Sequence, residues 1–414
     1  MKWLLFTALM AMIGSVHALQ PPNVPGLLPK EIARPLLEQD PRVGAARAGL
    51  EVAKQESGIL DKSPYEWVGK AQGQRRSVDD GSRQIEWNLG VERTLRLAGK
   101  ASADRLTGKA TLEESQARYG VALNESAREL ASFWIEWLAA ERARELAADN
   151  LQAVQENLAV VEKRLRAGDA SRLDLNLAGA DLADQKRIDN DTRTQASAAW
   201  ARLSARFPGI TRQNMALPFA VLIAESDELW RNRVVDESEA LKMAQAQANM
   251  AQAQAERAKA ERVPDPTFGV YAASESGGRD QILGVTFSIP FAGGLRDLRS
   301  AKAVAAVEVA RSAVDHKRRE IEAQVATALA TARGTYGSLQ MANESTLAMQ
   351  QNAKLVQRAY TLGEGDLQTL LLARRQATAA SNNALQAQVA ALSVYLGLLI
   401  DARLIWSLEL SQQR

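Results

Sequence analysis

The sequence predicts a mainly α-helical protein with a small β part, built from two internal repeats of long coiled-coil helices and two β-hairpins. Three observations predict this fold. Proline is missing from two very long stretches, short segments beside them alternate strictly between apolar and polar residues, and the same motifs occur twice in the same order, about 194 residues apart.

The spacing of proline predicts the helices. None occurs between Pro64 and Pro208, or after Pro290, and a helix interior tolerates proline badly. Residues 100–167 alone would form about 100 Å of helix at ~1.5 Å per residue, which no compact domain needs. We expect helices at 41–60, 100–167 and 173–207, then at 236–262, 295–362 and 367–404. Apolar residues spaced by three and four within the first long helix predict a coiled coil, with a single amphipathic helix on a globular core as the alternative: Leu151, Val154, Leu158, Val161 and Leu165.

Alternating residues predict the strands. RQIEWNLGVER at 83–93 has one apolar and one polar face, and residues 281–289 repeat the pattern. Partner strands are expected near 66–75 and 267–274. Strands of about ten residues with alternate apolar positions fit an outer-membrane barrel, in which every backbone polar group is paired. Four strands cannot close a pore, so several chains must share it; a soluble sheet packed on the helices is the alternative. The predicted lipid-facing residues are Ile85, Trp87, Leu89, Val91, Leu283, Val285, Phe287 and Ile289.

The internal repeat sets the boundaries of the two halves. LGVERTLRLAG at 89–99 matches LGVTFSIPFAG at 283–293, and RAGDASRLDLNLA at 166–178 matches TLGEGDLQTLLLA at 361–373. Residues 1–18 are assigned as a signal peptide, because Lys2 is followed by an apolar run that ends before a small-residue cleavage site, Val16-His17-Ala18. Residues 19–40 are a proline-rich segment, 41–207 the first repeat, 208–235 a connection, 236–404 the second repeat and 405–414 a C-terminal tail.

Composition argues against several classes of protein. The 51 basic and 49 acidic residues are interspersed, which gives no electrostatic case for nucleic acid. There is no cysteine, and after the signal peptide there is one histidine, His316, so no metal site can be assembled from these residues. No phosphate-binding loop and no supported nucleophile occurs. We predict no enzymatic activity, no cofactor and no metal site.

The signal peptide, the two repeats, the strand pair in each and the glycine turn that ends each long helix together resemble the TolC-type outer-membrane efflux proteins. The resemblance implies a homotrimer with one twelve-stranded outer-membrane barrel on a periplasmic α-helical tunnel, in a Gram-negative bacterium. GVERTLRLAGKASADR at 90–105 resembles the heavy-metal-cation branch most, where a Gly-Lys pair follows the second strand.

The resemblance also implies two sites. The glycine turns would form the periplasmic tips that dock to an adaptor protein: Ala167, Gly168, Asp169, Ala170 and Ser171, and Leu362, Gly363, Glu364, Gly365 and Asp366. The tunnel constriction would involve Asp174, Tyr360 and Thr369. The family's basic partner for that constriction falls on Gly365, and its acidic ring falls on Thr369 and Leu372, so a salt-bridged latch of that kind cannot form here.

These expectations lead to one main function and two alternatives. The main one is a passive exit duct of a tripartite efflux pump, which docks to a periplasmic adaptor and an inner-membrane transporter and exports toxic small solutes or metal cations. The first alternative is the outer-membrane duct of a type I protein secretion system. The second is a soluble periplasmic coiled-coil structural or adaptor protein without a barrel.

Overall fold

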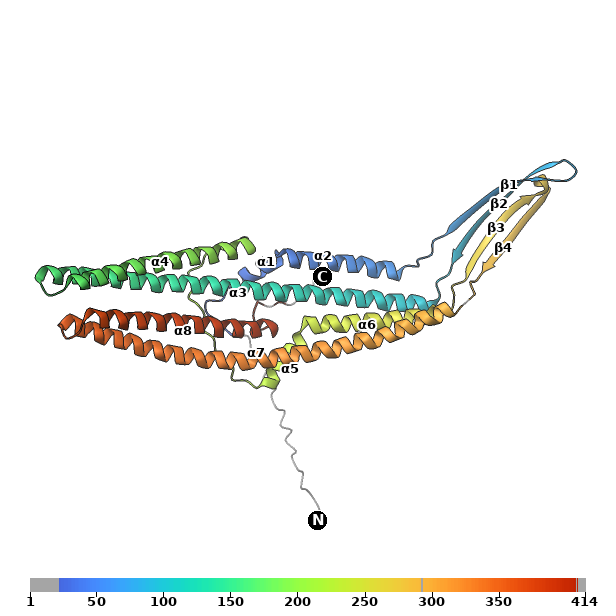
Figure 1. Cartoon of the computed structure of the whole chain (residues 1–414). Coiled ribbons are helices and arrows are strands. Elements are labelled where there is room, and N and C mark those ends of the chain that lie inside the picture. Colours follow the sequence, from blue (N-terminus) through green and yellow to red (C-terminus); the bar gives the residue numbers. More distant parts are fainter. Residues whose placement is uncertain (1–21, 292, 407, 409–414) are drawn as a thin grey trace, which may run out of the picture.

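The protein is an elongated arm with a sheet at one end and two sharp helical turns at the other (Figure 1). The computed structural model describes residues 22–291, 293–406 and 408. The expected signal peptide at 1–18 lies outside the described residues. Within them, the fold is mainly α with one small sheet, as the sequence predicts.

Two very long helices run along the arm. Helix α3 (Ala98–Ala167) has 70 residues and α7 (Gly294–Leu362) has 69. Shorter helices pack beside them: α2 (Pro41–Asp61) and α4 (Arg172–Arg206) along α3, α6 (Glu239–Ala260) and α8 (Leu367–Asp401) along α7. Helix α6 also packs against α3 and joins the two halves. The two halves therefore repeat each other, as the sequence indicates.

Two short helices occupy segments where the sequence predicts none. Helix α1 (Lys30–Glu38) lies in the proline-rich segment and contains Pro35. Helix α5 (Asp227–Glu237) lies mostly in the connection between repeats. The helix expected at 236–262 is wrong at its start, because the backbone of Ser238 is extended and its side chain accepts a hydrogen bond from the Leu241 backbone N–H. Such a serine caps a new helix rather than continuing the old one.

The two predicted hairpins form one antiparallel sheet of four strands in sequence order. These are β1 (Val68–Ser77), β2 (Arg83–Thr94), β3 (Thr267–Glu275) and β4 (Asp280–Ser288). Strands β2 and β3, which belong to different repeats, pair from Trp87 opposite Ser274 to Thr94 opposite Thr267. The hairpins are therefore joined within one chain, which leaves β1 and β4 as the two edges of the sheet.

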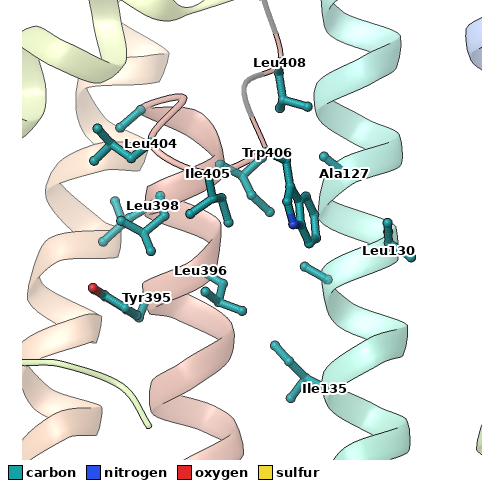
Figure 2. Packing of buried hydrophobic residues seen from close by; sticks show 14 of the residues in the cluster. Ala127, Leu130, Ile135, Tyr395, Leu396, Leu398, Leu404, Ile405, Trp406 and Leu408 are labelled. Carbon is teal, nitrogen blue, oxygen red and sulfur yellow. The ribbon is translucent and has the colours of Figure 1, made fainter. Parts of the chain in front are cut away.

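The largest core lies near the middle of the arm, where both ends of the described chain meet α3. The indole N–H of Trp134 donates to the Gly26 carbonyl at 2.9 Å, and that of Trp406 donates to the Leu28 carbonyl at 2.8 Å. Figure 2 shows Trp406 and Leu408 beside the apolar side chains of α3 and α8. The first residues of the predicted C-terminal tail (405–414) are thus packed into this core.

Among the described helices, α8 alone is long and apolar enough to cross a membrane by length and composition. In the structure, 44% of its most apolar 18-residue window is buried inside the protein. Its apolar side chains pack against α3 and α7. We attribute its composition to this core position.

A buried carboxylate ties α2, α3 and α4 together. Asp40 caps α2 and accepts hydrogen bonds from Ser126 Oγ at 2.6 Å, from Arg206 Nη2 at 2.6 Å and from the Arg42 backbone N–H at 2.9 Å. Burial alone would raise the pKa of Asp40, but these hydrogen bonds outweigh it and lower the pKa from 3.8 to about 2. The carboxylate is thus held in its charged form.

A lowered pKa makes this joint sensitive to acid. The stabilisation is complete above the unfolded pKa near 3.8 and is lost as pH falls from there toward about 2. We expect wild type to lose on the order of 2 kcal/mol of unfolding free energy across this window through Asp40. Asp40→Asn should be less stable at neutral pH and should lose less on acidification, as chemical denaturation at pH 7 and pH 3 would measure. Equal losses in both proteins would contradict this assignment.

Candidate functional sites at the two ends of the arm

One face of the sheet is apolar and exposed along its length. All eight predicted lipid-facing side chains lie on it, with exposures between 43% at Ile289 and 86% at Leu283. Strand β3 adds Phe268 and Val270, which the sequence analysis did not include. Ile289 follows the end of β4 directly. We call this surface the apolar face; so large an exposed apolar area indicates contact with lipid or with another protein.

The opposite face is polar, and its charges are paired. Lys70 Nζ lies 2.6 Å from Glu92 Oε2, and Arg76 Nη2 lies 3.1 Å from Glu86 Oε2. Gln74 donates a further hydrogen bond to Glu86 at 2.7 Å. This polar face, with one ion pair near each end, is suited to contact with water. Strands with one apolar face and one polar face are typical of a membrane barrel.

Below the sheet, a buried network joins the strands to the helices. Asp265, just before β3, receives a hydrogen bond from the Tyr65 hydroxyl at 2.8 Å and another from the Leu97 backbone N–H at 3.1 Å. Lys100 Nζ lies 3.0 Å from the same carboxylate, and both side chains are only 4% exposed. We call Asp265, Lys100 and Tyr65 the junction cluster. It fixes the segments before β1, after β2 and before β3 relative to one another.

At the far end of the arm, both predicted turns are built by glycine. Gly168 and Gly363 cap α3 and α7 with φ of 87° and 81°, the left-handed region that glycine adopts most easily. Serine and aspartate then start the returning helices, since Ser171 caps α4 and Asp366 caps α8. Backbone and side-chain hydrogen bonds from Thr369 lower the pKa of Asp366. Eight of the ten predicted tip residues are exposed at the surface, and Ala170 and Gly365 are half-buried.

The three candidate constriction residues all have local structural roles. Asp174 completes the capping box with Ser171, and Thr369 donates to Asp366 from both its backbone N–H and its hydroxyl. Tyr360 is 4% exposed and packs with Val161 and Leu370 in a small core behind the turns. The Arg164 guanidinium lies 4.9 Å from the centre of its ring. Each of the three side chains is thus engaged by its own neighbours, and their role in a constriction stays a prediction.

The described residues contain no group of three or more metal-ligating side chains.

A model of the family described as outer membrane efflux protein matches residues 33–206 and 230–398 of the chain. The chain belongs to the outer membrane efflux protein family. Membership confirms the predicted fold family and identifies the molecule as an outer-membrane efflux channel component that extends into the periplasm, and not an enzyme. It rules out the alternative of a soluble periplasmic protein without a barrel.

One protein of similar sequence and two solved structures of similar fold are compared with the chain as follows. The chain is 25% identical over 321 residues to the nickel-cobalt-cadmium resistance protein NccC of Alcaligenes xylosoxydans xylosoxydans, covering 76% of this chain and 72% of NccC. The crystal structure of CusC is similar with a TM-score of 0.74 and 16% identity, over 92% of this chain and 97% of CusC. The outer membrane protein VceC of Vibrio cholerae is similar with a TM-score of 0.71 and 16% identity, over 90% of this chain and 95% of VceC.

Sequence reasoning found both ends of the arm but missed the junction cluster. Lys100 appears in the sequence only as part of a Gly-Lys pair, and Asp265 lies between two prolines in a segment that reads as a loop. Their partnership joins residues 165 positions apart. Lys100 lies in the first turn of the helix after β2 and Asp265 lies just before β3. This placement near the ends of two strands is the one signal that could have linked them.

Proposed function

We propose that three copies of this chain close their sheets into one twelve-stranded barrel, with the apolar face toward lipid and the polar face toward a water-filled lumen. The observation that carries this proposal is the sheet itself: it has two unpaired edges and an apolar face at one end of a helical arm about 100 Å long. Unpaired strand edges do not persist in a bilayer, since every backbone polar group there needs a partner. Closure by further copies supplies those partners.

At the other end, the two glycine turns dock to a periplasmic adaptor, which links the duct to an inner-membrane transporter. The proposal is supported by their position at the free end of the arm and by exposed leucines beside them, Leu173 at 61% and Leu362 at 66%. Exposed apolar side chains on a rigid turn provide contact area for a partner without prior rearrangement.

Gly363→Trp tests this docking. A Cβ at Gly363 would meet no atom within 4 Å, so the change costs only about 1–2 kcal/mol of backbone strain and points a large ring outward. We expect normal trimers in the membrane, several-fold less cross-linking to the adaptor, and loss of efflux-dependent resistance.

Gly81→Trp is the matched control for this variant. Gly81 has φ of 83° and equally open space, but it lies in the hairpin loop at the opposite end of the arm. Wild-type cross-linking is expected there. Undiminished cross-linking of the Gly363→Trp protein would show that docking does not use this turn.

For the cargo, we propose toxic metal cations. The support is the 25% identity to NccC, a nickel-cobalt-cadmium resistance protein. A strain that lacks this chain should become more sensitive to nickel, cobalt or cadmium and should recover when the gene is restored. Unchanged metal sensitivity with a loss of organic-drug resistance would replace metals with drugs as cargo. Loss of a secreted polypeptide instead would favour the type I secretion duct.

A further inference from the structure

Two arginines lie on the apolar face at the end of the sheet that is farthest from the helices. Arg75 of β1 stands opposite Ile85 of β2, and Arg83 of β2 stands opposite Ser77 of β1. Directly opposite residues share a face, so both arginines lie on the face of Ile85, and both are exposed. They occupy diagonal positions of one strand pair, where Cα atoms are about 7–8 Å apart. We call Arg75 and Arg83 the outer arginine pair.

This end of the sheet lies toward the cell exterior. The hairpin loop at 78–82 forms the tip of the sheet, at the opposite end from its junction with the arm (Figure 1). Because the helical arm of an outer-membrane efflux channel extends into the periplasm, the tip lies on the side of the outer leaflet. The outer arginine pair therefore lies where the apolar face meets that leaflet.

The charges of the outer arginine pair have no counter-charge in the described part of the chain. Neither side chain there forms an ion pair or a hydrogen bond with a carboxylate. The strand carboxylates at this end belong to the polar face: Glu86 pairs with Arg76, and Glu275 stands opposite Asp280. Basic groups are thus separated from acidic groups by the sheet itself, and a partner for the pair has to come from outside the chain.

At the other end of the same face, an arginine is engaged by its own chain. Arg93 of β2 stands opposite Phe268, and its Nε donates to the Tyr65 carbonyl at 3.3 Å. The Arg93 guanidinium also lies 5.3 Å from the centre of the Trp67 ring. The sheet therefore supplies partners for an arginine at its inner end and none for the two at its outer end.

The spacing of these arginines matches the thickness of the membrane. Arg83 and Arg93 are ten positions apart on β2, which is about 34 Å along a strand at ~3.4 Å per residue. A barrel tilt of about 35–45° reduces this to roughly 24–28 Å across the membrane, close to the apolar band of ~25 Å in outer-membrane barrels. Arginine is costly on the lipid face at the midplane and nearly without cost at the interfaces. The outer arginine pair thus lies at the level of the outer-leaflet headgroups.

We propose that the outer arginine pair binds a phosphate group on the headgroup of an outer-leaflet lipid, with one site on each copy. A guanidinium binds phosphate oxygens through two parallel N–H···O hydrogen bonds, and two neighbouring guanidiniums can engage one phosphate together. The proposal rests on the proposed barrel, which turns the apolar face to lipid, and it adds the class of lipid that the outer rim holds.

A lipid fits this position better than free phosphate. Ile85, 74% exposed, lies beside Arg75, and Trp87, 45% exposed, follows on the same face toward the middle of the membrane. These side chains provide apolar contact for acyl chains directly below the phosphate. A phosphate ion from solution would use the two charges but none of this apolar surface.

Native mass spectrometry of the detergent-purified trimer tests the site, with diphosphorylated lipid A as the probe. Arg75→Gln combined with Arg83→Gln should weaken its binding about tenfold or more, and each single variant several-fold, because charge-assisted hydrogen bonds to phosphate are lost. The matched control, Lys70→Gln with Arg76→Gln, removes the same charge from the polar face of the same strands. We expect this control to bind the lipid as wild type does.

Two further ligands separate phosphate from lipid, and they use only the wild-type protein. Lipid A from which both phosphates have been removed should bind about tenfold more weakly or less. Inorganic phosphate at the same concentration as the probe should not displace diphosphorylated lipid A. Undiminished binding of the dephosphorylated lipid would overturn the phosphate contact, and full displacement by inorganic phosphate would overturn the assignment to lipid.

The variants separate this site from the barrel. Wild-type affinity in trimers of the Arg75→Gln, Arg83→Gln protein would overturn the site and leave the barrel standing. An equal loss of affinity in the polar-face control would overturn it as well, since net charge and not position would then decide binding. Wild-type protein that is monomeric in the membrane would overturn the proposed barrel itself.

Discussion

Arginine in place of Val285 is expected to remove most of the protein from the outer membrane. Val285 lies near the middle of β4 and is 83% exposed on the apolar face. In water, a substitution at so exposed a position changes stability by about 0.5 kcal/mol or less. Against lipid at the bilayer midplane, arginine costs ~2–4 kcal/mol, and each copy in the ring bears this cost. The assembly of this variant therefore shows whether the apolar face is in contact with water or with lipid.

Thr286→Arg is the matched control for this prediction. Thr286 is the next residue, is also exposed, and points to the polar face opposite Gly269. We expect it to assemble close to wild type, as judged by the amount of heat-modifiable trimer in outer-membrane fractions. The pair Trp87→Arg and Asn88→Arg repeats the comparison on β2. Equal assembly of the variants on both faces would remove the lipid-facing assignment.

Asp265→Asn is expected to be the most damaging single change outside the strands. The amide keeps one acceptor oxygen, which can accept from the Leu97 N–H, while its NH2 group replaces the oxygen that accepts from Tyr65. The Lys100 ammonium is left buried without its counter-charge. Removal of one partner of a buried pair costs roughly 3–5 kcal/mol. We expect faster proteolysis at the junction between sheet and helices and a lower yield of assembled protein.

The physical cause is checked by a second substitution. Lys100→Met combined with Asp265→Asn removes both charges, so much of the loss should be recovered. Burial by itself would raise the pKa of Asp265, but hydrogen bonds from Lys100, Tyr65 and Leu97 lower it, so its contribution should be lost only as pH falls below the unfolded value near 3.8. A double variant as unstable as Asp265→Asn would show that geometry, not charge, holds this junction.

Much of the fold could be predicted because its signals are local. The absence of proline marks α3 and α7 whatever packs against them, and the alternation through Trp87 and Val285 assigns side chains to faces by backbone geometry alone. Gly168 and Gly363 end their helices because the left-handed conformation favours glycine at those points. Each of these features depends on a few neighbouring residues.

The candidate sites were predicted less completely. Asp174 and Thr369 read as polar residues available to a tunnel lumen, whereas hydrogen bonds at the starts of α4 and α8 already engage them. Tyr360 lies in a core that α3, α4, α7 and α8 form together. Whether a side chain faces a channel or a neighbouring helix depends on four elements at once, and the spacing within one helix does not contain that information.

By itself, the sequence determined the two repeats, the long helices, the glycine turns and the division of the strands into an apolar and a polar face. These follow from backbone preferences and from periodicity, which act over a few residues. Only the tertiary structure decided that β2 pairs with β3, that Asp265 meets Lys100 and that Asp40 meets Arg206. Such contacts join residues between 165 and 187 positions apart, and their free energy exists only once packing has removed both partners from water.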